Sequence, residues 1–178
     1  GGLKLSADAL YVGLPAQLDH APVGFIAVHG HLHTAAAGCD GVITAVGAQL
    51  LRRGYGGEPV AVLMDKHPHT LATFFGIIYA GCFYAALDAD MPPARMGLIL
   101  DTLAPRLLIC DKKNEKTARK LVEEGIFKGE LLHWADVCAD ESREVTPADE
   151  VALTAVRNRQ IDTDPIYVVF TSGSTGVP

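Results

Sequence analysis

The chain has 178 residues, of which 49% are hydrophobic and 20% charged, and its net charge at pH 7 is −6. This length suits one ordinary domain, and the apolar fraction is sufficient for a folded core and argues against a disordered chain. Because there is no basic block and no apolar run of roughly 18 residues, we expect neither a nucleic-acid partner nor a membrane span.

The cysteines and the start of the chain favour a reduced, cytoplasmic protein. The opening residues, GGLKLSADAL, lack a charged stretch followed by an apolar one, so we expect no signal peptide. The four cysteines form no CxxC pair, and two of them lie inside apolar runs, where a free Cys behaves as a small hydrophobe. We therefore predict free thiols rather than disulfides at all four positions: Cys39, Cys82, Cys110 and Cys138.

Predicted strands and helices then alternate along the chain. A hairpin is expected over residues 23–34, around Gly30. Asp40 can cap a following helix, whose apolar residues recur at helical spacing and which Gly54 can end. Further along, short apolar runs typical of buried strands alternate with segments of helical length. The remaining predicted strands are 59–64, 82–88, 106–111, 129–134 and 165–170, and the remaining predicted helices are 67–81, 93–104 and 113–125.

This order predicts an α/β fold. Continuous apolar strands that alternate with helices indicate right-handed crossovers and a mostly parallel sheet flanked by helices on both faces. A charged stretch with one proline, residues 139–150, is typical of a surface loop or connector. No repeat or low-complexity linker divides the chain, so residues 1–178 are predicted to form one unit.

The last twelve residues, YVVFTSGSTGVP, place a predicted strand directly before a loop of Gly, Ser and Thr. Ligands of parallel sheets bind beyond the carboxyl ends of the strands, which is where this loop would emerge. Gly173 and Gly176 allow the backbone to approach a phosphate closely, and backbone N–H groups and hydroxyls would supply neutral donors. The Walker and GxGxxG patterns are absent. On composition alone, a flexible tail explains the loop equally well.

Two segments nevertheless resemble the adenylate-forming enzymes, the AMP-forming ligases that include acyl-CoA synthetases, luciferases and adenylation domains of nonribosomal peptide synthetases. Residues 167–178 resemble their motif Y-x-x-x-T-S-G-S-T-G-x-P-K, up to the Lys that would follow Pro178. Residues 79–95 resemble L-x-A-G-x-x-Y-x-P-x-D-x-x-x-P-x-x-R, with departures at Ala86, Ala89 and Met91. The matching positions in this segment are Ala80, Gly81, Tyr84, Asp88, Pro92 and Arg95.

The resemblance implies a fold, a reaction and a binding site. The chain would be the N-terminal portion of the adenylate-forming fold, broken off within the phosphate-loop motif. The complete enzyme would use ATP to convert a carboxylate into an acyl-adenylate, and would then pass the acyl group to the thiol of CoA or of a carrier protein. The loop would bind the ATP phosphates, through Thr171, Ser172, Gly173, Ser174, Thr175 and Gly176. Mg²⁺ is implied, with its ligands and the catalytic residues beyond residue 178.

The D-x-x-x-P-x-x-R form of the second segment looks most like the amino-acid-activating members, the peptide synthetase adenylation domains and the D-alanine–carrier protein ligases. An acyl-CoA synthetase is the alternative within the family. A non-catalytic α/β binding or assembly module is the alternative of another class, because Ala86 departs from the motif and the family's T-Y-x-E-L segment is missing after Thr34.

Other polar residues favour structural interpretations. His29, His31 and His33 alternate as zinc ligands on one strand would, but the resemblance makes Gly30 a turn, so we expect no metal there. His67 and Pro68 are typical of a helix start. For Asp88 and Arg95, two intervening prolines favour a structural polar contact over a catalytic pair.

Overall fold

The computed structural model describes residues 40–137 and 144–170. Within these residues, none of the helices has the length and apolar character that crossing a membrane would require. Several predictions fall outside the described residues: the hairpin at 23–34 with its three histidines, Cys39, Cys138, and the phosphate loop at 171–176.

Four parallel strands form the centre of the molecule. They are β1 (Pro59–Leu63), β2 (Phe83–Ala86), β3 (Leu107–Cys110) and β4 (Glu130–His133), arranged in the order β2-β1-β3-β4. The predicted parallel sheet is therefore confirmed.

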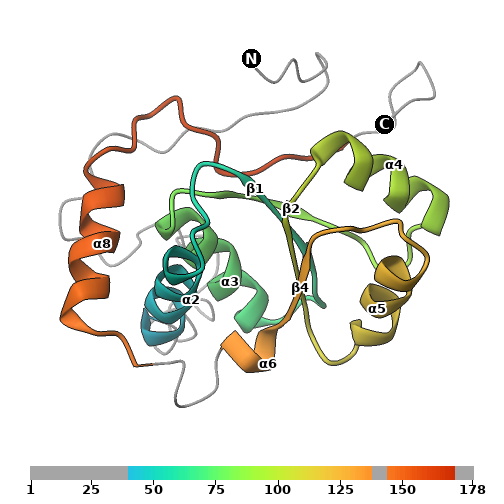
Figure 1. Cartoon of the computed structure of the whole chain (residues 1–178), viewed down its shortest axis with the longest axis horizontal. Helices are drawn as coiled ribbons and strands as arrows, with labels where there is room; N and C mark the ends of the chain where they lie inside the picture. Colours follow the sequence, from blue (N-terminus) through green and yellow to red (C-terminus); the bar gives the residue numbers. More distant parts are fainter. Residues whose placement is uncertain (1–39, 138–143, 171–178) are drawn as a thin grey trace, which may run out of the picture.

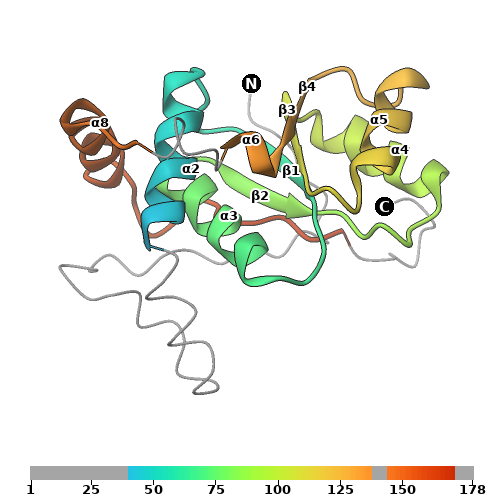
Figure 2. The same cartoon turned by 90° about the horizontal axis from the view of Figure 1, so that it is seen from below.

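Helices cover both faces of this sheet. One face carries α2 (Asp40–Arg52) and α3 (Pro68–Tyr79), and the other carries α4 (Pro93–Leu103) and α5 (Glu115–Glu123) (Figures 1 and 2). The connections β1-α3-β2, β2-α4-β3 and β3-α5-β4 place each helix between two parallel strands, as the alternating sequence pattern predicts.

The core is divided by the sheet, because successive strand residues point to opposite faces. On β1, Val60 and Val62 pack in the cluster that includes α2 and α3, whereas Ala61 and Leu63 pack in the cluster that includes α4 and α5. The residues of β3 alternate in the same way, and all four are buried. Burial on both faces explains why these strands are continuous apolar runs in the sequence.

Both ends of α3 carry residues whose conformational preferences predict a helix end. His67 precedes α3, and its Nδ1 accepts a hydrogen bond from the backbone N–H of His69 at 3.2 Å, with Pro68 in the first turn. Gly81 follows α3 with a φ of 75°, a left-handed conformation that suits glycine. The predicted helix start at residues 67–68 is confirmed.

The predicted loop at 139–150 is wrong over its last four residues, which begin helix α8 (Pro147–Arg157). Thr146 and Asp149 form a capping box: the Thr146 hydroxyl oxygen accepts from the Asp149 N–H at 3.3 Å, and the Asp149 carboxylate accepts from the Thr146 N–H at 2.8 Å. Pro147 suits the first helical turn, where no N–H partner is needed. Cap geometry thus outweighs the charged, loop-like composition.

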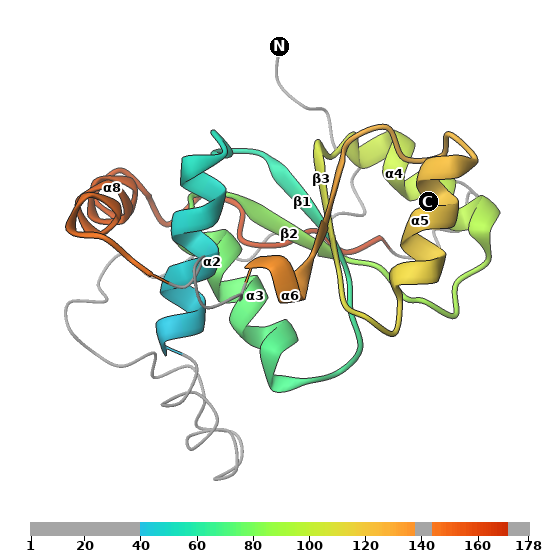
Figure 3. The same cartoon turned by 60° about the horizontal axis from the view of Figure 1, so that its bottom comes forward.

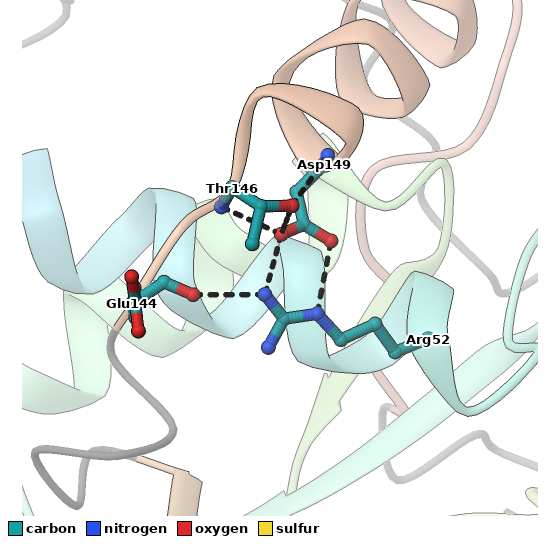
Figure 4. Close-up of polar contacts among 4 residues, drawn as sticks. All are labelled: Arg52, Glu144, Thr146 and Asp149. Carbon is teal, nitrogen blue, oxygen red and sulfur yellow. Dashed lines mark hydrogen bonds and ion pairs between the residues drawn. The ribbon is translucent and has the colours of Figure 1, made fainter.

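An ion pair joins α8 to the end of α2 (Figure 4). Arg52 Nε donates to Asp149 Oδ1 at 2.9 Å, and an Arg52 Nη donates to the other carboxylate oxygen and to the Glu144 carbonyl. On α8, Leu153 is buried. Farther along the chain, the Gln160 side chain donates to the Ile78 carbonyl of α3 at 2.9 Å. Helix α8 therefore extends the α2 and α3 layer.

Two predicted strands need correction. The segment 129–134 is a strand only as far as His133, because Trp134 begins the short helix α6 (Trp134–Val137). The segment 165–170 forms a single parallel bridge, between Tyr167 and Tyr84, in place of a regular strand. Its residues run along β2, but consecutive ladder bonds are missing.

Candidate functional site

The segment before the predicted phosphate loop lies along the outer edge of β2. The Tyr84 N–H donates to the Ile166 carbonyl at 3.2 Å, and the Val168 N–H donates to the Tyr84 carbonyl at 2.9 Å. Figures 1 and 3 show this segment passing from α8 alongside β2. Because the pairing is parallel, β2 and residues 165–170 lead toward the same edge of the sheet.

Side chains fix this segment on both faces of the sheet. The Phe74 and Tyr84 rings stack with centroids 4.0 Å apart, and the Tyr84 and Tyr167 rings follow at 5.9 Å. On the opposite face, Val168 is buried and Phe170 packs against the core cluster of α4 and α5. Burial, and to a smaller extent the nearby Tyr167, raises the pKa of the Tyr84 phenol. The last described residues are therefore anchored immediately before the loop begins.

The structure brings together the two segments that carry the family resemblance. Residues 79–95 include β2 and the start of α4, and residues 167–170 lie along β2. In the sequence, more than seventy residues separate these segments. The phosphate-loop residues 171–176 lie outside the described residues, so their contacts with a nucleotide stay a prediction.

The expected contact between Asp88 and Arg95 is wrong. An Asp88 carboxylate oxygen accepts from the Asp90 N–H at 2.9 Å and makes no ion pair with Arg95. Arg95 is half-buried, and its Nε is shielded from solvent without a hydrogen-bond partner. Asp88 lies in the connection between β2 and α4, and Arg95 lies in the first turn of α4, but the two side chains form no ion pair.

A polar cluster closes the carboxyl ends of β1 and β3, the two neighbouring strands at which the sheet reverses its order. The Asp65 N–H donates to the Asp111 carboxylate at 2.8 Å, and Lys113 pairs with the Asp65 carboxylate. Asp111 also accepts from the N–H and the side-chain amide of Asn114, at 2.9 and 2.8 Å. The ammonium group of Lys113 lowers the pKa of Asp65, and this carboxylate in turn raises the pKa of Lys113. The polar groups of this cluster pair with one another, so the cluster has a structural role and links the loop after β1 to the loop after β3.

Aromatic rings stack beside that cluster. His69 lies on Trp134 with ring centroids 4.2 Å apart and an interplanar angle of 17°, and His67 is tilted against His69 at 4.4 Å. Within residues 40–137 and 144–170, no three or more His, Cys, Asp or Glu side chains, these histidines included, lie close enough together to hold a metal ion. The stack joins the start of α3 to α6.

The two described cysteines match the prediction of buried free thiols. Cys82 and Cys110 are unpaired and are 1% and 0% exposed. Burial raises the pKa of each thiol to about 11, so at neutral pH they behave as small apolar side chains.

A surface depression of about 460 Å³ lies at the opposite end of the sheet. Its lining includes Gly56 and Gly57, which precede β1, Gly81, which precedes β2, and Arg159 after α8. Ligands of parallel α/β sheets bind at the carboxyl ends of the strands. We therefore place the candidate site at the carboxyl edge beside β2 and not in this depression.

A parallel sheet with helices on both faces defines the chain as an α/β protein. The family model "AMP-binding enzyme" matches residues 42–178, which is more than half of the chain. The chain therefore belongs to the AMP-binding enzyme family, and the resemblance to adenylate-forming ligases is confirmed.

Sequence relatives include peptide synthetases. The chain is 31% identical over 134 residues to nonribosomal peptide synthetase opaA of Aspergillus ustus, and 30% identical over 176 residues to nonribosomal peptide synthetase anaPS of Neosartorya fischeri. These matches cover 75% and 97% of this chain, but only 3% and 6% of the relatives. The anguibactin system regulator of Vibrio anguillarum is 25% identical over 185 residues, which cover all of this chain and 16% of that protein.

Solved structures share the fold. A red-emitting luciferase from Phrixothrix hirtus has a TM-score of 0.66 at 17% identity, with 83% of this chain and 39% of that chain covered. VinN has a TM-score of 0.60 at 22% identity, with 80% and 36% covered. The predicted α/β fold, that of the N-terminal portion of adenylate-forming enzymes, is thereby confirmed.

Proposed function

We propose that the complete protein is an ATP-dependent, AMP-forming ligase that activates an amino acid as its acyl-adenylate and transfers the acyl group to a thiol. Residues 1–178 would form its N-terminal α/β subdomain. The observation that carries this proposal is that residues 167–170 lie parallel to β2. Both segments that resemble the family therefore lead to one edge of the sheet. The family match over residues 42–178 gives the reaction class.

Residues 171–176 would hold the β- and γ-phosphates of ATP while pyrophosphate leaves. Backbone N–H groups and the hydroxyls of Thr171, Ser172, Ser174 and Thr175 would stabilise the developing negative charge. Such donors are effective only when they are fixed in advance, because donors that reorganise during the reaction lose most of their value. The anchoring of Val168 and Phe170 in the core supports this requirement at the point where the loop begins.

The identity of the acid and of the acceptor belongs to the same proposal. The peptide synthetases among the relatives favour an amino acid substrate and the thiol of a carrier protein over a fatty acid and CoA. The Mg²⁺ that accompanies ATP would be bound by residues of the complete protein beyond residue 178, as the resemblance implies. The buried free thiols of Cys82 and Cys110 support a reducing, cytoplasmic compartment.

Carboxylate-dependent exchange of pyrophosphate into ATP tests this proposal. The protein produced from its complete gene is assayed with panels of amino, aryl and fatty acids, and we expect exchange with one or a few amino acids. A valine side chain at position 173 would keep the backbone from approaching the phosphates closely, so we expect Gly173→Val to reduce exchange at least about 100-fold. Gly41→Val is the matched control, because a Cβ at Gly41 meets nothing within 4 Å. Folded protein that shows no exchange with any acid would refute the proposal.

A further inference from the structure

His133 joins β4 to α6 through its imidazole ring. It is the last residue of β4, and its Nδ1 accepts a hydrogen bond from the Ala135 backbone N–H at 3.2 Å. This bond satisfies one of the N–H donors at the start of α6, as a side-chain cap does. Because Nδ1 accepts, it carries no proton, and in the neutral ring the proton therefore lies on Nε2.

The other ring nitrogen faces an acidic side chain without bonding to it. Among the described residues, His133 Nε2 has no hydrogen-bond partner, although it is shielded from solvent. Glu115 Oε2 lies 3.9 Å from Nε2, which is too far for a hydrogen bond but close enough for an ion pair once the ring is charged. The other oxygen of Glu115 accepts from Arg119 Nε at 2.9 Å, so this carboxylate is already held in place on α5.

Charged groups of both signs surround the ring. On the sheet, His133 is the ladder partner of Cys110, whose thiol is buried. On the side of α3, His69 stacks on Trp134, and His67 contacts His69. The charged groups that act on Cys110 or Glu115 are the acidic Asp111 after β3 and Asp136 of α6, and the basic Arg119 and Lys112. Of the groups around the ring, Glu115 is the one within ion-pair distance of it.

A second proton on the ring has opposite effects on its two sides. An imidazolium carries a hydrogen on both nitrogens, so Nδ1 becomes a donor and can no longer accept from the Ala135 N–H. Two donors then face each other at the start of α6, and the cap is lost. On the other side, the positive charge attracts the Glu115 carboxylate. Protonation of His133 therefore exchanges a contact with α6 for a contact with α5.

Helix α6 depends on its cap because it is short. It has four residues, and a helix of this length is not stable without capping and packing. Trp134 stacks on His69 with ring centroids 4.2 Å apart, and Val137 is buried in the core cluster of α2 and α3. The Trp134 Nε1 is shielded from solvent and has no hydrogen-bond partner among the described residues. Opening of α6 would give this N–H a water partner, which offsets part of the lost packing.

We propose that His133 is a pH-sensitive switch for α6. When the ring is neutral, Nδ1 caps α6 and Trp134 stays stacked on His69. When the ring takes up a second proton, the cap is lost, α6 opens and His133 pairs with Glu115. Histidine side chains ordinarily change charge between about pH 5 and 8, so the switch operates in the physiological range. This inference does not depend on the proposed function.

Hydrogen–deuterium exchange at two pH values tests the proposal in the protein produced from its complete gene. We expect the protection of the α6 amides of Ala135, Asp136 and Val137 to fall at least about 5-fold between about pH 7.5 and about pH 5.5, after correction for the intrinsic pH dependence of exchange. The amides of β1 and β3 should keep their protection. Equal protection of α6 at both pH values would overturn the proposal, whatever the variants show.

His133→Asn is the matched variant, because an asparagine oxygen can accept from the Ala135 N–H and does not titrate. We expect its α6 protection to change less than about 2-fold between the two pH values, and a full loss in the folded variant would overturn the proposal. Glu115→Gln removes the negative charge that stabilises the protonated ring, so the pH at which α6 loses protection should fall by about 1 unit. If His133→Asn does not fold, Glu115→Gln decides, and an unchanged transition pH would overturn the proposal.

His69 is the alternative source of a pH dependence, because its ring stacks on Trp134. His69→Phe keeps a flat ring in this place but cannot take up a proton. We therefore expect its α6 amides to lose protection at the same pH as in the unmodified protein. If the pH dependence disappears in His69→Phe and persists in His133→Asn, the switch belongs to His69 and the role of His133 is refuted.

Discussion

Replacing Gly76 with alanine should destabilise the layer formed by α2 and α3. A Cβ at Gly76 would lie 2.5 Å from the Cβ of Val46, 2.6 Å from its Cγ1 and 2.9 Å from the carbonyl oxygen of Ile43. Real Cβ atoms essentially never approach other atoms this closely, and the Val46 Cβ cannot rotate away because it is attached to the backbone. The two helices would have to separate.

The size of the effect follows from two opposing terms. Overpacking of a well-packed core costs about 1–3 kcal/mol, and the short distance to a backbone-linked atom favours the upper part of this range. Alanine is better than glycine in a helix interior by about 1 kcal/mol. We therefore expect the free energy of unfolding to fall by about 1–2 kcal/mol, which lowers Tm by roughly 3–6 °C in a domain of this size.

Urea unfolding followed by circular dichroism measures this change, and a second glycine gives the matched control. Gly97 lies in α4, and a Cβ there would have only an ordinary contact of 3.4 Å with Ile126. For Gly97→Ala, the higher helix propensity of alanine is almost the only effect, so the free energy of unfolding should rise by about 0.5–1 kcal/mol. The two identical substitutions should therefore have opposite signs. A Gly76→Ala protein as stable as the unmodified one would refute the close packing of α2 on α3.

Two further predictions concern charge and thiols. Asp149→Asn should lower the free energy of unfolding by about 1–2 kcal/mol at pH 7, because the substitution weakens the ion pair and the helix cap. Arg52 holds the pKa of Asp149 well below its usual range, so the difference in unfolding free energy between the two proteins should be constant above about pH 5. Toward pH 3 the carboxyl of the unfolded chain becomes protonated, so urea unfolding should show a smaller difference there. A difference that does not change with pH would contradict this reasoning. Cys82 and Cys110 should resist a thiol reagent at pH 8 in the native protein and react after unfolding, as mass spectrometry of their peptides would show; rapid native labelling of either would contradict their burial.

The sheet could be predicted from the sequence because its strands are buried on both faces. Continuous apolar runs such as 59–64 and 106–111 have few other interpretations when helical segments separate them. The helix ends were predictable where a single residue has a strong conformational preference, as with Pro68 and Gly81.

Helix α8 was missed because only part of it enters the core. Of its residues, Asp149 and Leu153 are buried and Val151 is 70% exposed, so its apolar pattern is weak. The signal that could have found it is the cap: Thr146 followed by Pro147 and Asp149 is the pattern of a capping box with proline in the first turn. Charge and proline content outweighed this signal in the sequence interpretation.

The candidate site was only partly predictable. The motif at residues 167–178 indicated the phosphate loop, but no spacing in the sequence placed residues 167–170 beside β2, because that requires a bridge between Tyr84 and Tyr167. The sequence favoured a structural contact between Asp88 and Arg95, because two prolines lie between them. In the structure the Asp88 carboxylate instead accepts from the Asp90 N–H, and Arg95 lies in the first turn of α4.

The placement of residues 167–170 depends on their contacts with β2 and with the helices packed on the sheet. Phe74 of α3, Tyr84 of β2 and Tyr167 stack in succession, so the position of Tyr167 is linked through β2 to a helix on one face of the sheet. On the other face, Val168 and Phe170 link the same segment to the cluster that α4 joins. A single backbone bridge is weak, yet these side chains hold the segment from both sides. The residues of β2 and of the helices packed on the sheet therefore set the position of the segment as far as Phe170.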